Sequence, residues 1–218
     1  MTDLSRTQFL QLTSSPMLAP VVDADRGAKS FISIIYETHS PTTDNDRGLA
    51  TGWNEGALSA AGLVAARAIG SRRRHDHVTA VYSSDLFRAA ETASLAFADS
   101  NIPVFFDSRL RECNYGALNG ARTQLVFRDR TRNVHERYPG GESYLDVAHR
   151  MAAFLEVLAS KPRKGRILLL SHSAPKWALD YLLLRVPLET SVLSPFRWQP
   201  GWAYTVPVGW QATKTSRE

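Results

Sequence analysis

Four short runs of apolar, aromatic or β-branched residues constrain the fold of this chain more than any other feature. They cover residues 31–36, 79–82, 104–106 and 166–170, and runs of this kind are typical of buried strands. Helical patterns over 59–72 and 85–97 stand between them, and Ser143 with Asp146 three positions later predicts a capping box at the start of another helix. Strands that alternate with helices predict an α/β fold, with one mostly parallel sheet and helices on both faces.

The remaining segments predict the ends of the domain. A helix is expected over 177–184, and an edge strand over 203–208, because Pro207 suits only the edge or end of a sheet. Residues 113–141 predict irregular structure, and the tryptophans at 177, 198, 202 and 210 are expected to pack the C-terminal part. We therefore expect an N-terminal tail over 1–28 with at most a short helix at 7–12, a single domain over 29–210, and a C-terminal tail over 211–218.

Charge and composition narrow the kinds of partner. The formal net charge of +5 favours anionic ligands, but no basic stripe with interleaved aromatic residues predicts nucleic-acid binding. No apolar run is long enough to span a membrane, and the N-terminus lacks the pattern of a secretion signal. The single cysteine, Cys113, excludes an internal disulfide and is expected to be a small buried residue. These features predict a cytoplasmic protein, favour a small phosphate over nucleic acid as its anionic partner, and leave a homodimer open.

Reactive side chains follow the predicted strands where those strands end. His39 follows the first strand, Arg88 the second, Glu112 the third and His172 the fourth, and ligands of open α/β sheets bind beyond these carboxyl ends. A neutral imidazole can attack phosphorus, a second imidazole and an arginine can neutralise the phosphoryl oxygens, and a carboxylic acid can protonate the leaving oxygen. The set is complete for phosphoryl transfer without a metal or another cofactor.

At these positions the sequence resembles the histidine phosphatase superfamily, which has the phosphoglycerate-mutase-like fold. The resemblance spans about residues 30–208 and is carried by the motifs at 83–93, 109–116, 139–150 and 171–173. It implies that His39 is the nucleophile, that Glu112 is the proton donor, and that Arg88 and His172 complete the catalytic set. The same resemblance implies that the substrate is bound by a further set of side chains, namely Thr38, Ser40, Thr42, Asn45, Tyr115 and Ser173.

The first motif departs from the family pattern of arginine, histidine and glycine, because Thr38 and Ser40 flank His39. The arginine would clamp the phosphate, so its charge must be missing or supplied elsewhere. Lys176 is the first candidate and Arg47 the second, and Lys176 is read equally well as a solvated helix residue.

The function that the resemblance implies is a metal-independent phosphatase of the branch with a short connection between Glu112 and His172. The alternatives are a binding module that has lost turnover and, less favoured, a phosphoglycerate-type mutase. The arginine-rich stretch 122–137 is read either as a lid or as a solvated loop. The other histidines, at 75, 77, 135 and 149, are interpreted as structural because none follows a predicted strand.

Overall fold

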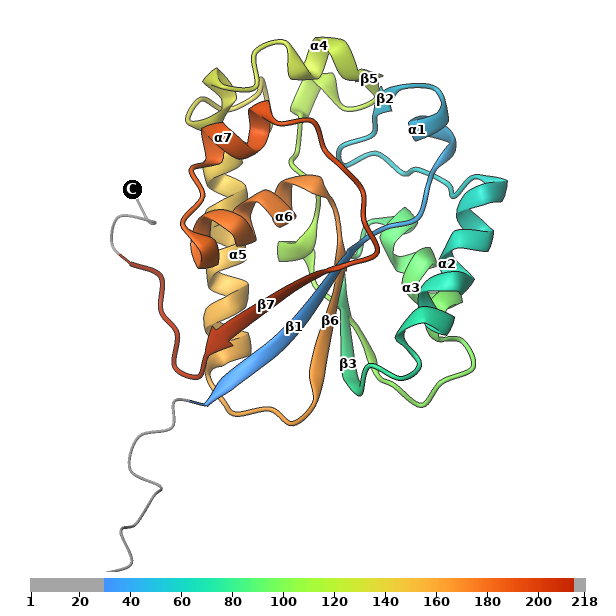
Figure 1. Cartoon of the computed structure of the whole chain (residues 1–218). Coiled ribbons are helices and arrows are strands. Elements are labelled where there is room, and N and C mark those ends of the chain that lie inside the picture. The colour runs from blue at the N-terminus through green and yellow to red at the C-terminus, as the bar shows by residue number, and fades with distance from the viewer. Residues whose placement is uncertain (1–29, 214–218) are drawn as a thin grey trace, which may run out of the picture.

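The computed structural model describes residues 30–213, which form a twisted sheet between two layers of helices (Figure 1). The strands of the main sheet stand in the order β4-β3-β6-β1-β7. They are β1 (Phe31–Thr38), β3 (Val78–Ser83), β4 (Val104–Phe106), β6 (Arg166–Ser171) and β7 (Trp202–Pro207). Only β7 runs antiparallel to its neighbour among them, so the predicted mostly parallel sheet is confirmed.

Helices cover both faces of this sheet. The longer ones are α2 (Ala60–Arg73), α3 (Phe87–Phe97), α5 (Tyr144–Ala159) and α6 (Ser173–Leu179). Alternate residues of a strand point to opposite faces. Ile34 and Leu169 accordingly join the cluster that contains the apolar face of α5, whereas Ile35 and Leu168 pack with Phe97 of α3. Figure 1 shows α2 and α3 on one side of the sheet and α5 and α6 on the other.

Two local predictions from the sequence are confirmed. Pro207 is the last residue of the edge strand β7, where it pairs with Phe31. The Ser143 Oγ accepts from the Asp146 N–H at 3.1 Å, and an Asp146 oxygen accepts from the Ser143 N–H at 2.9 Å. This reciprocal capping box begins α5.

The helices of the C-terminal part differ from the prediction. Helix α6 begins at Ser173, directly after His172, instead of at residue 177, and it continues into a π-helical turn, η4 (Asp180–Leu184). A further helix, α7 (Leu188–Leu193), was not predicted, because six residues are too few to set up a periodic pattern. The predicted helix at 85–97 begins only at Phe87, since the Ser84 side chain first accepts from the Leu86 N–H and holds a turn.

The stretch 113–141 is less irregular than predicted. It contains the helical turns η2 (Gly116–Leu118) and η3 (Arg132–Val134), the helix α4 (Thr123–Phe127) and the strand β5 (Ala121–Arg122). Strand β5 pairs with β2 (Leu49–Ala50), which follows the short helix α1 (Thr43–Asp46). A last turn, η1 (Ser108–Leu110), follows β4.

The termini fall largely outside the structure. The expected tail over 1–28, with its short helix at 7–12, lies outside the described residues, and the domain limits at 29 and 210 stay predictions. Between residues 30 and 213, no helix combines the length and the apolar character that crossing a membrane requires.

Candidate active site

A pocket of about 660 Å³ opens at the carboxyl ends of β1, β3 and β6. His39, Arg88 and Glu112 all line it, although they come from widely separated parts of the chain. His172 lies directly beside them, with its ring centroid 5.0 Å from that of His39 and the two planes tilted by 57°. The structure therefore brings together the four side chains that the sequence places after strands.

The hydrogen bonds of His39 fix which ring nitrogen is free to react. Its Nδ1 lies 2.8 Å from the backbone oxygen of Ser40, and Arg88 donates from Nε to His39 Nε2 at 3.3 Å. A guanidinium has no acceptor, so Nε2 carries the lone pair and Nδ1 carries the proton. Burial, with the nearby Arg88 charge, lowers the pKa of His39 to about 3. The imidazole is therefore neutral at neutral pH, with the lone pair of Nε2 facing Arg88.

Arg88 is a buried cation without a carboxylate partner in the described part of the chain. Its side chain is 2% exposed, and it donates to the carbonyls of Gly52 at 2.9 Å and Asn54 at 3.3 Å, besides His39. Gly52 has a φ of +55°, and a Cβ there would lie 1.9 Å from the Asn119 Oδ1, so a glycine is needed to present this carbonyl. Burial lowers the pKa of Arg88, but an arginine stays charged in proteins. A buried guanidinium that has no ion-pair partner is suited to an anion.

His172 is fully buried, and neither of its ring nitrogens has a hydrogen-bond partner among the described residues. Burial, followed by the charge of Arg88, lowers the pKa of His172 well below its usual value. Its backbone is held by Tyr36, whose hydroxyl donates to the His172 carbonyl and accepts from the His172 N–H at 3.1 Å. Buried polar groups are rarely left unpaired, so this ring is available for a ligand.

The Glu112 carboxylate lies at the N-terminal end of α6 and accepts four hydrogen bonds. Oε1 accepts from the backbone N–H groups of Cys113 at 2.8 Å and Ala174 at 3.1 Å. Oε2 accepts from the N–H of Ser173 at 3.2 Å and from its hydroxyl at 2.9 Å. The hydroxyl is the only one of these four donors that can rotate away from the carboxylate.

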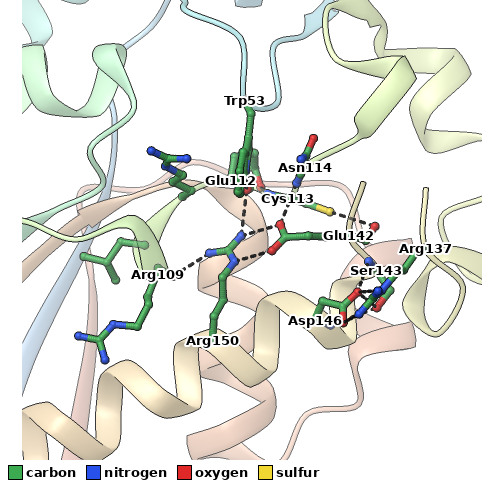
Figure 2. A network of polar contacts seen from close by, with 12 residues as sticks. Trp53, Arg109, Glu112, Cys113, Asn114, Arg137, Glu142, Ser143, Asp146 and Arg150 are labelled. Carbon is green, nitrogen blue, oxygen red and sulfur yellow. Dashed lines mark hydrogen bonds and ion pairs between the residues drawn. The ribbon is translucent and has the colours of Figure 1, made fainter. Parts of the chain in front are cut away.

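A network behind Glu112 holds its backbone in place (Figure 2). Arg150 of α5 donates to the carbonyl of Glu112 at 2.9 Å and to that of Arg109 at 2.7 Å, and it pairs with the Glu142 carboxylate at 2.9 Å. Trp53 donates from its indole N–H to the same Glu112 carbonyl at 2.7 Å. The loop that carries the carboxyl is thus tied to α5.

The residues predicted to bind substrate divide into two groups. Thr38, Ser40, Asn45, Tyr115 and Ser173 line the pocket, and the buried hydroxyl of Ser40 has no hydrogen-bond partner in the described chain. Thr42 does not line the pocket. It is fully buried as the N-cap of α1, where it forms a capping box with Asn45, so its observed contacts shape the loop.

The two candidates for the missing positive charge lie elsewhere. Lys176 lines a neighbouring pocket, where it pairs with Asp180 at 2.6 Å and lies over the ring of Trp202. The expectation that Lys176 joins the phosphate end is not met, because an acidic residue one turn along the same helix holds its ammonium. Arg47 is exposed at the end of α1 and does not line the pocket either.

Sequence reasoning missed most of the outer wall of the pocket. Ile69 of α2, Phe127 of α4, and Phe196 and Trp198 of the segment before β7 all line it. Trp198 is 61% exposed, so the expectation that it packs the C-terminal part is wrong. The only sequence signal for an exposed position is that Trp198 lies between Pro195 and Pro200. The arginine-rich stretch contributes Thr123, Phe127 and Arg130 to the pocket, and its lid function stays a prediction.

The remaining candidates behave as ordinary structural residues. Cys113 is fully buried, and burial raises the pKa of its thiol, which disfavours the nucleophilic thiolate. None of the four other histidines lines the pocket. Within residues 30–213, no group of three or more His, Cys, Asp or Glu side chains is arranged to hold a metal ion.

Comparison with known proteins finds relatives named as a phosphoglycerate mutase and as a phosphatase. A probable phosphoglycerate mutase, GpmB, of Salmonella choleraesuis is 32% identical over 169 residues, which cover 72% of this chain and 77% of the relative. A mycobacterial glucosyl-3-phosphoglycerate phosphatase, solved with VO3, has a TM-score of 0.65 at 26% identity and covers 75% of this chain and 86% of its own.

YhfR of Bacillus stearothermophilus shares the fold, with a TM-score of 0.70 at 21% identity and coverage of 79% of this chain and 90% of its own. The family model of the histidine phosphatase superfamily (branch 1) matches residues 38–196, a span that begins next to His39 and includes Arg88, Glu112 and His172. With most of the described chain matched, this protein belongs to the histidine phosphatase superfamily, branch 1.

Proposed function

We propose that the protein is a metal-independent phosphatase that hydrolyses phosphate monoesters through a phosphohistidine at His39. The observation that carries the proposal is the state of His39: a neutral imidazole whose Nε2 lone pair faces a buried, carboxylate-free Arg88. A pure structural histidine needs no such neighbour. A phosphoryl group bound by Arg88 would lie next to the attacking nitrogen.

The reaction follows from the positions of these groups. Nε2 of His39 attacks phosphorus, forming an N–P bond while the P–O bond of the ester breaks. The guanidinium of Arg88 passes from Nε2 to the phosphoryl oxygens, and His172 lies close enough to His39 to donate to them as well. The proton on Glu112 goes to the leaving oxygen, which departs as the alcohol.

The second half returns the site to its first state. Water attacks the phosphohistidine, and Glu112 takes the proton that the water loses, so phosphate leaves and the neutral His39 is restored. For the first half Glu112 has to be protonated, and the Ser173 hydroxyl must then turn away from Oε2 so that the proton there can go to the leaving oxygen. Ser173 therefore acts as a positioning residue for the proton.

A binding module without turnover is the second candidate, and Thr38 is the observation that favours it. Thr38 lines the pocket where the family pattern has an arginine, so one phosphate-binding charge is lacking. Against it stands Glu112, because a protein that only binds a phosphate dianion gains nothing from a carboxylate close to it. A mutase activity of this chain, suggested by the name of one relative, would also pass through a phosphohistidine at His39 and would differ in handing the phosphoryl group to an organic acceptor instead of water.

Phosphate release from a panel of esters in the presence of a chelator tests the proposal. Wild-type protein should release phosphate, and His39→Ala should reduce release to the background while the circular dichroism spectrum stays unchanged. Rapid quenching with a labelled ester should trap acid-labile phosphate on His39. Label on another residue contradicts the mechanism, and release that persists in His39→Ala contradicts the assignment of the nucleophile.

A further inference from the structure

The pocket changes character with distance from the histidines. Its inner end carries His39, Arg88 and Glu112, whereas its outer walls are formed largely by apolar side chains from three separate segments. A volume of about 660 Å³ falls in the range of pockets that hold drug-sized ligands. A phosphate group with a three-carbon chain would leave most of this space unfilled.

Three aromatic rings and the buried Ile69 form an apolar part of the pocket wall. Ile69 comes from α2, Phe127 from α4, and Phe196 and Trp198 from the segment that joins α7 to β7. Trp198 is 61% exposed and Phe196 is 38% exposed. Large apolar side chains that are exposed together at the rim of a pocket mark a binding surface. Arg73 donates to the carbonyl of Pro200 at 2.8 Å and holds this segment against α2.

Two described cations line the pocket besides Arg88, and one of them, Arg72, is already held in an ion pair by the protein itself. Arg72 forms a bidentate pair with the buried Glu37, with Nη2 3.1 Å from both carboxylate oxygens. Arg72 therefore presents no free fork to a second anionic group of a substrate, such as the carboxylate of a glycerate. Arg130 lies with its guanidinium carbon 3.3 Å from the centre of the Phe127 ring and donates from Nη1 to the carbonyl of Val192, while its buried Nε has no hydrogen-bond partner in the described chain. A comparison with 3-phosphoglycerate tests whether Arg130 receives a carboxylate.

We infer that the substrate is a phosphate monoester of a bulky, apolar alcohol, whose hydrocarbon part lies between Ile69, Phe127 and Trp198. The inference rests on the proposed function for its phosphate end, and on the outer wall alone for its apolar end. Burial of hydrocarbon at this wall supplies binding affinity that the site loses because Thr38 stands where the family pattern has an arginine.

Primary n-alkyl phosphates from propyl to octyl test the inference, because their leaving alcohols are nearly equal in acidity and only the buried length changes. We expect kcat/KM to rise about three- to fourfold for each methylene that enters the pocket, and to exceed kcat/KM for 3-phosphoglycerate. Trp198→Ala should flatten this increase and lower kcat/KM for hexyl phosphate about tenfold. Phe106→Ala removes an exposed aromatic ring of β4 that does not line the pocket and should leave the series unchanged.

Binding of the non-hydrolysable n-alkylphosphonates, measured by calorimetry, separates the two proposals. A Kd that falls along the series without any ester turnover overturns the phosphatase function and supports the apolar pocket. The other outcome is that the protein hydrolyses p-nitrophenyl phosphate while kcat/KM for the alkyl phosphates and Kd for the alkylphosphonates do not change with chain length. That result, or a preference for 3-phosphoglycerate, overturns the apolar assignment and leaves the phosphatase function intact.

Discussion

Arg88 donates from its Nε to the Nε2 of His39 across 3.3 Å, so the cation that would bind the phosphoryl group also marks the nitrogen that would attack it. The guanidinium is buried and bound only to neutral acceptors in the described chain. This arrangement lets an arriving phosphate take over hydrogen bonds without having to break an ion pair first.

Replacing Arg88 should affect both rate and titration. Arg88→Met removes at least two charged hydrogen bonds to phosphate, each contributing about 1.5–3 kcal/mol, so kcat/KM should fall by a factor of about 100 or more. Since the Arg88 charge lowers the pKa of His39, its removal should raise that pKa, measured from the imidazole C–H signals by NMR. Arg111→Met, at an arginine paired with Asp85 outside the pocket, is the control. An unmoved His39 pKa would contradict the electrostatic coupling.

Acid should destabilise the fold through the buried histidines. The pKa of His39 is lowered to about 3 and that of His172 is also lowered, so between pH 6.5 and about 3 the unfolded chain binds protons that the folded His39 does not. The free energy of unfolding should then fall with decreasing pH below 6.5, by about 1.4 kcal/mol per pH unit for each such histidine. Urea denaturation of wild type and His39→Asn at several pH values measures the difference in slope. Equal slopes in the two proteins would contradict the buried, neutral state of His39.

Glu112→Gln should distinguish esters by their leaving groups. The amide cannot donate the proton that an alkoxide needs, so kcat for alkyl phosphates should fall by a factor of about 100 to 10,000, the range for general acid catalysis. A nitrophenyl ester needs little protonation and should be slowed far less. Equal slowing of both esters would show that Glu112 acts only as the acceptor for the N-terminal groups of α6.

Thr38→Arg should restore the charge that the first motif lacks. A bidentate contact would lower the inhibition constant of inorganic phosphate about tenfold or more, whereas Thr38→Met, with similar bulk and no charge, should not. Lys176→Ala should leave phosphate inhibition within about twofold, because Lys176 pairs with Asp180 outside this pocket. A large effect of Lys176→Ala would instead place its ammonium at the phosphate during turnover.

Arg150 should matter to stability far more than the exposed arginine nearby in the same network (Figure 2). Arg150→Met removes donors from two backbone carbonyls and leaves Glu142 without its ion pair, which should cost about 3 kcal/mol of unfolding free energy. Arg137→Met breaks the exposed pair with Asp146 and should cost at most about 1 kcal/mol. Thermal and urea unfolding of both variants measure the contrast, and equal losses would contradict the role of Arg150 in holding the Glu112 loop.

The sequence predicts those site residues whose position depends on the element that directly precedes them in the chain. His39, Arg88, Glu112 and His172 each follow a strand, and parallel strands bring their carboxyl ends to one edge, so their meeting could be predicted. The outer wall could not be predicted, because Ile69, Phe127 and Trp198 come from segments that no local pattern relates. Lys176 was misplaced for a similar reason: its partner, Asp180, became apparent only once the helix was seen to begin at Ser173.

The last hydrogen bond between β1 and β6 is made by His39, the proposed nucleophile. The His39 N–H donates to the Ser171 carbonyl at 2.8 Å, directly beyond the pairing of Thr38 with Ser171. The backbones of His39 and His172 are thus held at a fixed distance by the hydrogen bonds that pair β1 with β6. This distance can change only if these two central, buried strands separate. The His39 amide proton should therefore exchange with solvent as slowly as amides in the middle of the sheet, even though its ring faces the pocket. Ligands that enter or leave would have to be accommodated by the loops around the mouth, while the catalytic pair keeps its spacing for as long as the fold persists.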